Sequence, residues 1–144
     1  YINREEQTRD MLWTSPEGLV FYRSGDMGRV DEEGFVYILD RRKDMIISGG
    51  FNIYAVDLET VLLAHPAVAD VAVIGIPSEQ WGETPLGLVV LKPGCTEDEA
   101  EILDWANGQL GKAQRLTAIE FRPELPRSTI GKVLKRDLRA PYWP

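Results

Sequence analysis

Histidine and cysteine are almost missing from this sequence of 144 residues, which contains one of each, His65 and Cys95. A single cysteine excludes an internal disulfide and a cysteine-based metal site. A single histidine leaves almost nothing for Ser-His-Asp catalysis or for a histidine-rich metal site. His65 lies in "LLAHPAV", at the expected end of a helix, and we interpret it as a structural residue.

Long apolar runs and a surplus of basic residues are missing as well. No stretch approaches the roughly 18 apolar residues of a membrane-spanning helix, and no signal peptide opens the sequence. Against 23 acidic residues stand 16 Lys and Arg, which gives a formal net charge of −7. Because nucleic-acid surfaces need clustered positive charge, we expect no nucleic-acid partner, no transmembrane segment and a cytoplasmic location. The sequence opens without Met, and we expect it to be part of a longer protein.

The first third of the sequence predicts β-structure that ends at a boundary near Asp40–Lys43. The segment "GRVDEEGFVYILD" (28–40) has the pattern of a β-hairpin in which Gly34 takes a positive φ, and 19–23 predicts a further strand. So short a part cannot bury a core alone. We therefore expect it to pack against another body.

The remaining residues predict an α+β domain, a small β-sheet with flanking helices. We expect strands in 44–48, 52–54, 68–77, 85–92 and 116–121, and helices in 56–65, 96–110 and 131–139. The helix in 96–110 has the clearest start, where Thr96 and Glu99 fit a capping box and acidic residues fill the first turn.

The segment "LPRSTIGKVLKRDLR" (125–139) carries five basic residues in an acidic protein. Locally it predicts a turn at Gly131 between a stiff lead-in at Pro126 and a solvated helix. A P-loop is excluded, because that motif needs a Gly where Pro126 stands and a Ser or Thr where Val133 follows Lys132.

Two further motifs are ambiguous on local grounds. Gly49 and Gly50 predict either a plain tight turn or a loop that lets a ligand approach the backbone, since no Cβ stands in the way. Asp26, in "YRSGD", either caps a turn or accepts hydrogen bonds from the two hydroxyls of a ribose. The run "DRRKD" (40–44) is either solvated or a linker.

The order of these motifs is more specific than any one of them. Y-R-S-G-D, G-R-x-D-x-x-G, D-R-x-K-D-x-I-I-x-x-G and P-R-S-x-x-G-K follow one another, and the chain thereby resembles the adenylate-forming superfamily of acyl-CoA synthetases, luciferases and peptide-synthetase adenylation domains. The resemblance implies an acid–thiol ligase that uses ATP, CoA and Mg²⁺, with the Mg²⁺ ligands outside this sequence. It further implies that 1–42 is the tail of a large N-terminal domain and 43–144 a small mobile C-terminal domain.

The resemblance also implies roles for six residues, carried over position by position. They are Asp26 and Arg41 for binding the nucleotide, Lys43 for the hinge, Gly49 and Gly50 for the loop beside the CoA pantetheine, and Lys132 for catalysis of adenylation. Bacterial relatives are acetylated at the lysine that corresponds to Lys132.

The basic residues after that lysine, Lys135, Arg136 and Arg139, are expected to cover the surface rather than to contact CoA phosphates. Relatives have an aromatic residue and a Pro at Ala113 and Leu116, so a carrier-protein thiol stays open as the acceptor, and a stand-alone module without catalysis is the third alternative. Fatty and aryl acids are the expected substrates. We expect the missing N-terminal domain to be a partner of this chain, and a homodimer is left open. The fragment alone is expected to be inactive.

Overall fold

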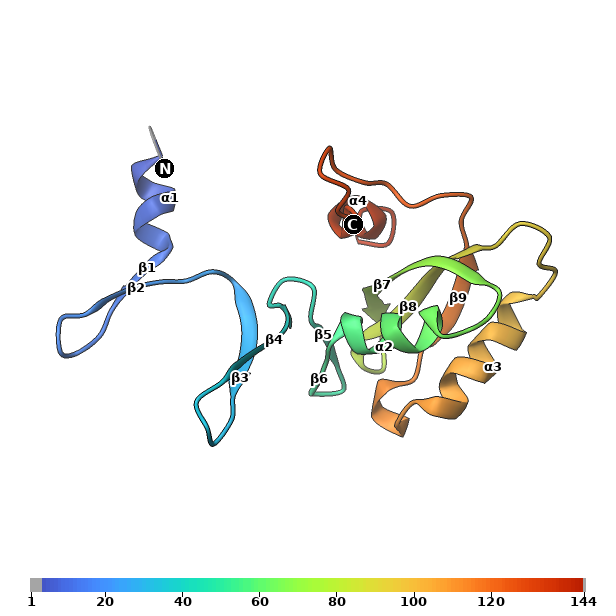
Figure 1. Ribbon diagram of the computed structural model, residues 1–144, viewed down its shortest axis with the longest axis horizontal. Helices are drawn as coiled ribbons and strands as arrows, with labels where there is room; N and C mark the ends of the chain where they lie inside the picture. The colour runs from blue at the N-terminus through green and yellow to red at the C-terminus, as the bar shows by residue number, and fades with distance from the viewer. Residues whose placement is uncertain (1–3, 144) are drawn as a thin grey trace. The chain divides into compact units, whose positions relative to one another are not determined.

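Figure 1 shows the computed structural model of the chain, in which residues 4–143 are described. The predicted α+β class is confirmed. Contacts divide the chain into two compact units, which meet in the sequence between Lys43 and Asp44. None of the helices among the described residues is long and apolar enough to cross a membrane.

The first unit consists of one short helix and two antiparallel strand pairs, β1 with β2 and β3 with β4. Its elements are α1 (Glu5–Asp10), β1 (Leu12–Thr14), β2 (Val20–Tyr22), β3 (Asp26–Val30) and β4 (Val36–Arg41). Between residues 4 and 43 no hydrophobic side chain is buried, in agreement with the expectation that this part has no core of its own.

The predicted hairpin is present as β3 and β4, and its turn is well defined. Gly34 has a φ of 89°. The carboxylate of Asp31 accepts hydrogen bonds from the backbone N–H groups of Glu33 at 3.0 Å and Phe35 at 2.9 Å. The bond from Phe35 favours the ionised carboxylate and lowers the pKa of Asp31. This turn fixes the register in which the two strands pair.

The second unit contains a five-stranded sheet and three α-helices. Its elements are β5 (Ile46–Ser48), β6 (Phe51–Ile53), α2 (Ala55–Leu63), β7 (Val68–Ser78), β8 (Gly82–Leu91), α3 (Glu99–Gln109), the 3₁₀ turn η1 (Lys112–Gln114), β9 (Ala118–Phe121) and α4 (Lys135–Arg139). The long antiparallel hairpin of β7 and β8 forms the centre of this sheet, and β9 pairs parallel with β8. The last residue of β5, Ser48, pairs with the first residue of β8, Gly82.

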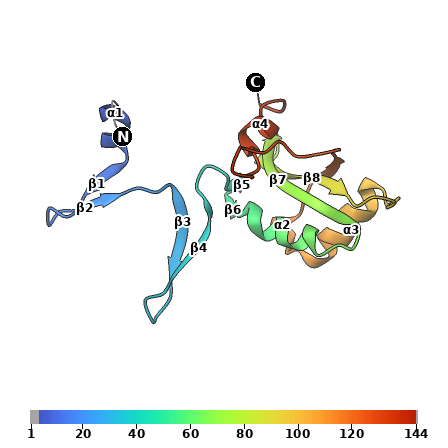
Figure 2. The same cartoon turned by 45° about the horizontal axis from the view of Figure 1, so that its top comes forward.

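The sheet of the second unit has an apolar cluster on each face, because side chains alternate along β7. Val71 and Val73 belong to the cluster that includes residues of α2 and α3, whereas Ala72 and Ile74 belong to the cluster that includes Leu138 of α4. Figures 1 and 2 show α2 and α3 near each other, with α4 apart from α3. Apolar side chains are therefore buried on both faces of the sheet.

The predicted capping box is wrong in its residues, although α3 does have one. The carboxylate of Asp98 accepts from the N–H of Glu101, and the carboxylate of Glu101 accepts from the N–H of Asp98. The same three-residue spacing occurs at Thr96 and Glu99, but α3 begins at Glu99, so Thr96 lies outside the helix.

The last predicted helix starts too early in the prediction. It begins at Lys135 rather than at Gly131, and the φ of 79° at Gly131 lies outside the right-handed α-helical region. The residues before α4 form a tight loop instead, and this loop carries Lys132.

Candidate functional site

Asp26 and Arg41 face each other across the β3–β4 pair of the first unit. They are register partners, and Nε of Arg41 lies 3.6 Å from Oδ1 of Asp26. The backbone N–H of Asp26 donates to Oγ of Ser24 at 3.2 Å, which fixes the start of the strand. A hollow of about 470 Å³ adjoins this pair and is lined by Ser24, Gly25, Arg41, Arg42 and Lys43. The carboxylate of Asp26 offers a hydrogen-bond acceptor for hydroxyl groups beside Arg41, a cation suited to phosphate.

Gly49 and Gly50 form the two-residue turn between β5 and β6, with φ of 55° and 84°. Positive φ at both central positions is what a tight hairpin turn of this kind requires. The N–H of Gly49 donates to the carbonyl of Trp81 at 2.9 Å, and a Cβ on Gly49 would lie 2.8 Å from the Trp81 ring. Gly49 is thus needed for its backbone conformation and for the close approach of Trp81.

A pocket of about 410 Å³ opens beside this turn. Its lining comes from three stretches of the second unit: Ser48, Gly49, Phe51, Trp81, Thr84, Lys112, Ala113, Arg115, Leu116 and Thr117. Aromatic rings and two cations stand together here, a combination that suits a ligand with a planar group and phosphates. The sequence reasoning missed Trp81, Lys112 and Arg115. A Trp in the otherwise polar loop "SEQWGET" was the available signal.

Lys132 lies at the end of a tight loop that an isolated bridge between Arg127 and Val133 closes. The N–H of Ser128 donates to the carbonyl of Lys132 at 2.8 Å, and the N–H of Lys132 donates to Oγ of Ser128 at 3.2 Å. Lys132 itself is exposed, and Gly131 takes its positive φ beside it. The loop thus fixes the backbone of Lys132 and leaves its side chain outside.

The Lys132 loop and the glycine turn lie toward opposite ends of β7. Arg127 contacts Asp70 near the start of β7, whereas Trp81, which meets Gly49, bonds to Ser78 at its end. Ser78 follows Asp70 by eight residue steps along the strand, about 26 Å at 3.3 Å per step. The structure therefore does not bring Lys132 and the two glycines together at one place.

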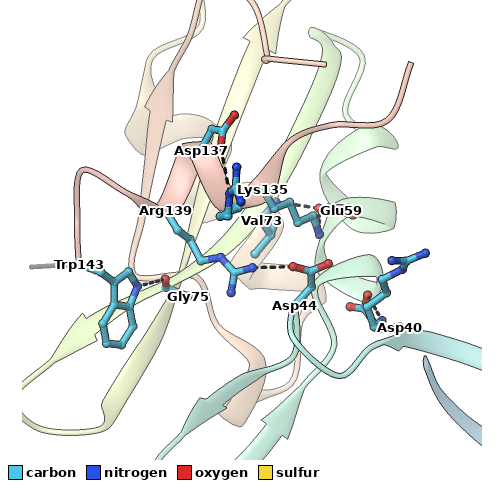
Figure 3. A network of polar contacts seen from close by, with 11 residues as sticks. Asp40, Asp44, Glu59, Val73, Gly75, Lys135, Asp137, Arg139 and Trp143 are labelled. Carbon is cyan, nitrogen blue, oxygen red and sulfur yellow. Dashed lines mark hydrogen bonds and ion pairs between the residues drawn. The ribbon is translucent and has the colours of Figure 1, made fainter. Parts of the chain in front are cut away.

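The expectation that Lys135 and Arg139 merely cover the surface is wrong. Nζ of Lys135 lies 2.7 Å from Glu59, and the guanidinium of Arg139 lies 2.6 Å from Asp44, with both cationic side chains at most a quarter exposed. Figure 3 shows these pairs joining α4 to the rest of its unit. Arg136, in contrast, is 92% exposed.

A metal site is not evident in the second or the first unit. Residues 4–143 contain no group of three or more His, Cys, Asp and Glu side chains suited to a metal ion. The rings of His65 and Trp105 are nearly perpendicular with their centroids 4.8 Å apart, and Nδ1 of His65 accepts a hydrogen bond from the N–H of Ala67. These contacts agree with the structural interpretation of His65.

Comparison with known proteins gives a family match and close relatives. The family model described as AMP-binding enzyme C-terminal domain matches residues 57–132, a range that ends on Lys132. A 2-succinylbenzoate–CoA ligase of Bacillus cereus is 44% identical over 139 residues, which are 96% of this chain and 27% of that protein.

Solved structures agree with this match. ATP-bound MatB from Rhodopseudomonas palustris has a TM-score of 0.84 and 40% identity, over 97% of this chain and 27% of that one. The o-succinylbenzoate CoA synthetase of Bacillus subtilis, in complex with the acyl-adenylate intermediate OSB-AMP, has a TM-score of 0.81 and 38% identity, over 96% and 27%. The chain thus spans about a quarter of the length of these relatives.

Proposed function

Because this chain belongs to the AMP-binding enzyme C-terminal domain family, we propose that it forms part of an AMP-forming carboxylic acid–CoA ligase. Such an enzyme first joins the acid to ATP, giving an acyl-adenylate and pyrophosphate, and then transfers the acyl group to the thiol of CoA. The observation that carries the proposal is the exposed Lys132 at the end of a rigid loop, inside the family match. An aryl acid such as 2-succinylbenzoate is our first candidate substrate, after the relative's name, and a fatty acid is the second.

In the first step the acid carboxylate attacks the α-phosphorus, and the bond from that phosphorus to the pyrophosphate oxygen breaks. Two anions meet and negative charge builds on the phosphoryl oxygens. The ammonium group of Lys132 offsets this charge, an effect worth roughly 3–4 kcal/mol for one well-aimed group in a site without water. The carboxylate of Asp26 accepts hydrogen bonds from the ribose hydroxyls, and Arg41 beside it contacts the nucleotide.

In the second step the CoA thiol attacks the acyl carbonyl and AMP leaves. We assign CoA to the pocket beside the glycine turn. Trp81 offers a ring face, Lys112 and Arg115 offer charges for phosphates, and the turn at Gly49 and Gly50 has no side chain to obstruct the pantetheine arm.

The separation of the two loops along β7 bears on how the steps follow each other. One reaction centre cannot contact Lys132 and the glycine turn at once if about 26 Å of strand lies between them. We propose that the small C-terminal domain, 43–144, turns about a hinge at Lys43 and presents first Lys132 and then the glycine turn. The tail of the large domain, 1–42, would stay with the nucleotide.

The assignment of the glycine turn predicts that Gly49→Ala slows thioester formation about tenfold or more while pyrophosphate exchange stays unchanged, since a displaced Trp81 misplaces the CoA arm. Stopped-flow or quenched assays of each half-reaction measure this. Gly94→Ala is the matched control, because Gly94 also has a positive φ, 84°, but no atom within 4 Å of the added Cβ. Equal losses for both variants would contradict the assignment.

The proposed function is tested with the full-length protein and a panel of aryl and fatty acids. We expect acid-dependent exchange of pyrophosphate into ATP, and AMP release when CoA is added. A carrier-protein acceptor is the second candidate, favoured by the small Ala113 in the pocket wall. It predicts thioester formation on a phosphopantetheine carrier and none on CoA. The absence of exchange with every acid would leave only a non-catalytic module.

A further inference from the structure

The loop that carries Lys132 is held by different contacts at its base, near Leu125 and Val133, and toward its tip, near Ile130. At the base, Leu125 is 6% exposed and Val133 packs on the same apolar cluster of the second unit. Toward the tip of the loop, the side chain of Ile130 is 76% exposed and is therefore not anchored by apolar burial. Val133, which follows Lys132, is thus held by apolar packing, whereas the restraint on Gly131, which precedes Lys132, must come from polar contacts.

Arg127 makes two such contacts with the two ends of one guanidinium group. Its Nη1 donates to the carbonyl of Gly131 at 2.7 Å, and its Nη2 donates to Oδ2 of Asp70 at 2.5 Å. The first bond crosses the loop to the residue directly before Lys132. The second reaches β7, an element of the rigid sheet. The planar fork of an arginine holds both bonds in one fixed geometry, whereas a lysine offers a single compact ammonium with rotatable donors.

We propose that Arg127, braced by Asp70, is a positioning residue for Lys132 in acyl-adenylate formation. The proposal rests on the proposed function of Lys132 and adds to it the part of the chain that aims the amine. Arg127 does not touch the substrate. It links the peptide before Lys132 to the sheet, so the direction in which the lysine leaves the loop is set by β7.

The solvent exposure of the Arg127–Asp70 pair distinguishes a positioning role from a role in folding stability. The side chains of Arg127 and Asp70 are 44% and 33% exposed. Ion pairs this open to solvent contribute little to folding stability. A small displacement of a catalytic group, in contrast, costs up to about a hundredfold in rate. Loss of the pair should therefore change the rate of one step far more than it changes the unfolding midpoint.

The experiment compares both half-reactions in variants of the full-length protein. We expect Arg127→Ala to slow pyrophosphate exchange about tenfold or more, with thioester formation from supplied acyl-adenylate unchanged. Arg127→Lys should recover part of the rate, since it keeps the ion pair and loses the second bond. Asp70→Asn should slow the exchange by a smaller factor. Arg122→Ala is the matched control, because Arg122 forms a 2.8 Å ion pair with Glu120 in the same unit.

The double variant Arg127→Ala/Asp70→Asn decides whether the two residues act through each other. We expect it to be no slower than Arg127→Ala alone, because the single change already breaks the brace. Strictly multiplicative losses would overturn the proposal, and so would equal losses in both half-reactions. If Arg127→Ala fails to fold, Arg127→Lys and Asp70→Asn test the proposal in its place, and unchanged exchange in both would overturn it.

The outcome for Lys132→Ala keeps the two proposals apart. Unchanged exchange in Lys132→Ala would overturn the proposed function, whatever Arg127 does. Lost exchange in Lys132→Ala together with full exchange in Arg127→Ala would overturn only the positioning role.

Discussion

Replacing Lys132 by Ala is expected to lower the rate of acyl-adenylate formation by the full-length protein about a hundred- to a thousandfold, because the proposed preorganised charge at the phosphoryl oxygens is lost. Thioester formation from supplied acyl-adenylate is expected to stay unchanged, since the phosphoryl chemistry is then complete. Pyrophosphate exchange measures the first rate, and the appearance of acyl-CoA measures the second.

Lys92→Ala is the control for this prediction. Lys92 is an exposed lysine of the same unit, and its Nζ donates to the carbonyl of Pro66. We expect it to change neither rate. Equal losses of both half-reactions in Lys132→Ala would show that the lysine supports the fold or substrate binding in general, and would remove its assigned role in adenylation.

Lys43→Pro is expected to spare adenylation and to lower CoA thioester formation by about a hundredfold, because a unit that cannot turn leaves the glycine turn misplaced. Proline fixes its own φ and restricts the residue before it, here Arg42. The position is sharply defined. Asp44 is held by Arg139 of α4 within the second unit, so we place the proposed rotation on the N-terminal side of Asp44.

Lys43→Ala is the control for the hinge, since it removes the same side chain and keeps the backbone free. It should leave both half-reactions near the starting rates, measured by the same pair of assays. If Lys43→Pro makes acyl-CoA as fast as the unchanged protein does, the hinge does not lie at this residue.

The fold was predictable where a local pattern fixes it. The hairpin of β3 and β4 follows from two β-rich runs around a turn with Gly34, and the pair of β7 and β8 follows from two long β-branched runs. The ends of helices were harder. Asp98 and Thr96 both stand three residues before a Glu, and the sequence does not show which of them caps α3. The start of α4 depends on the positive φ of Gly131, which the basic pattern does not reveal.

The candidate site was predictable in part, for a related reason. Residues such as Gly49 and Lys132 belong to short local motifs, which can be recognised in the sequence. The proposed CoA pocket is assembled from three segments, so Trp81 and Arg115 become neighbours only in the folded sheet. The partly buried ion pairs of α4 join residues far apart in the sequence, and a run of basic residues does not reveal such partners.

A crossed comparison of Lys132→Ala and Gly49→Ala, with both half-reactions measured on the same preparations, tests most directly whether the two ends of β7 serve successive steps. The account predicts that the lysine variant loses only pyrophosphate exchange and the glycine variant loses only acyl transfer to CoA. Parallel losses of both rates in both variants would mean that the two loops serve the same step, and would contradict it.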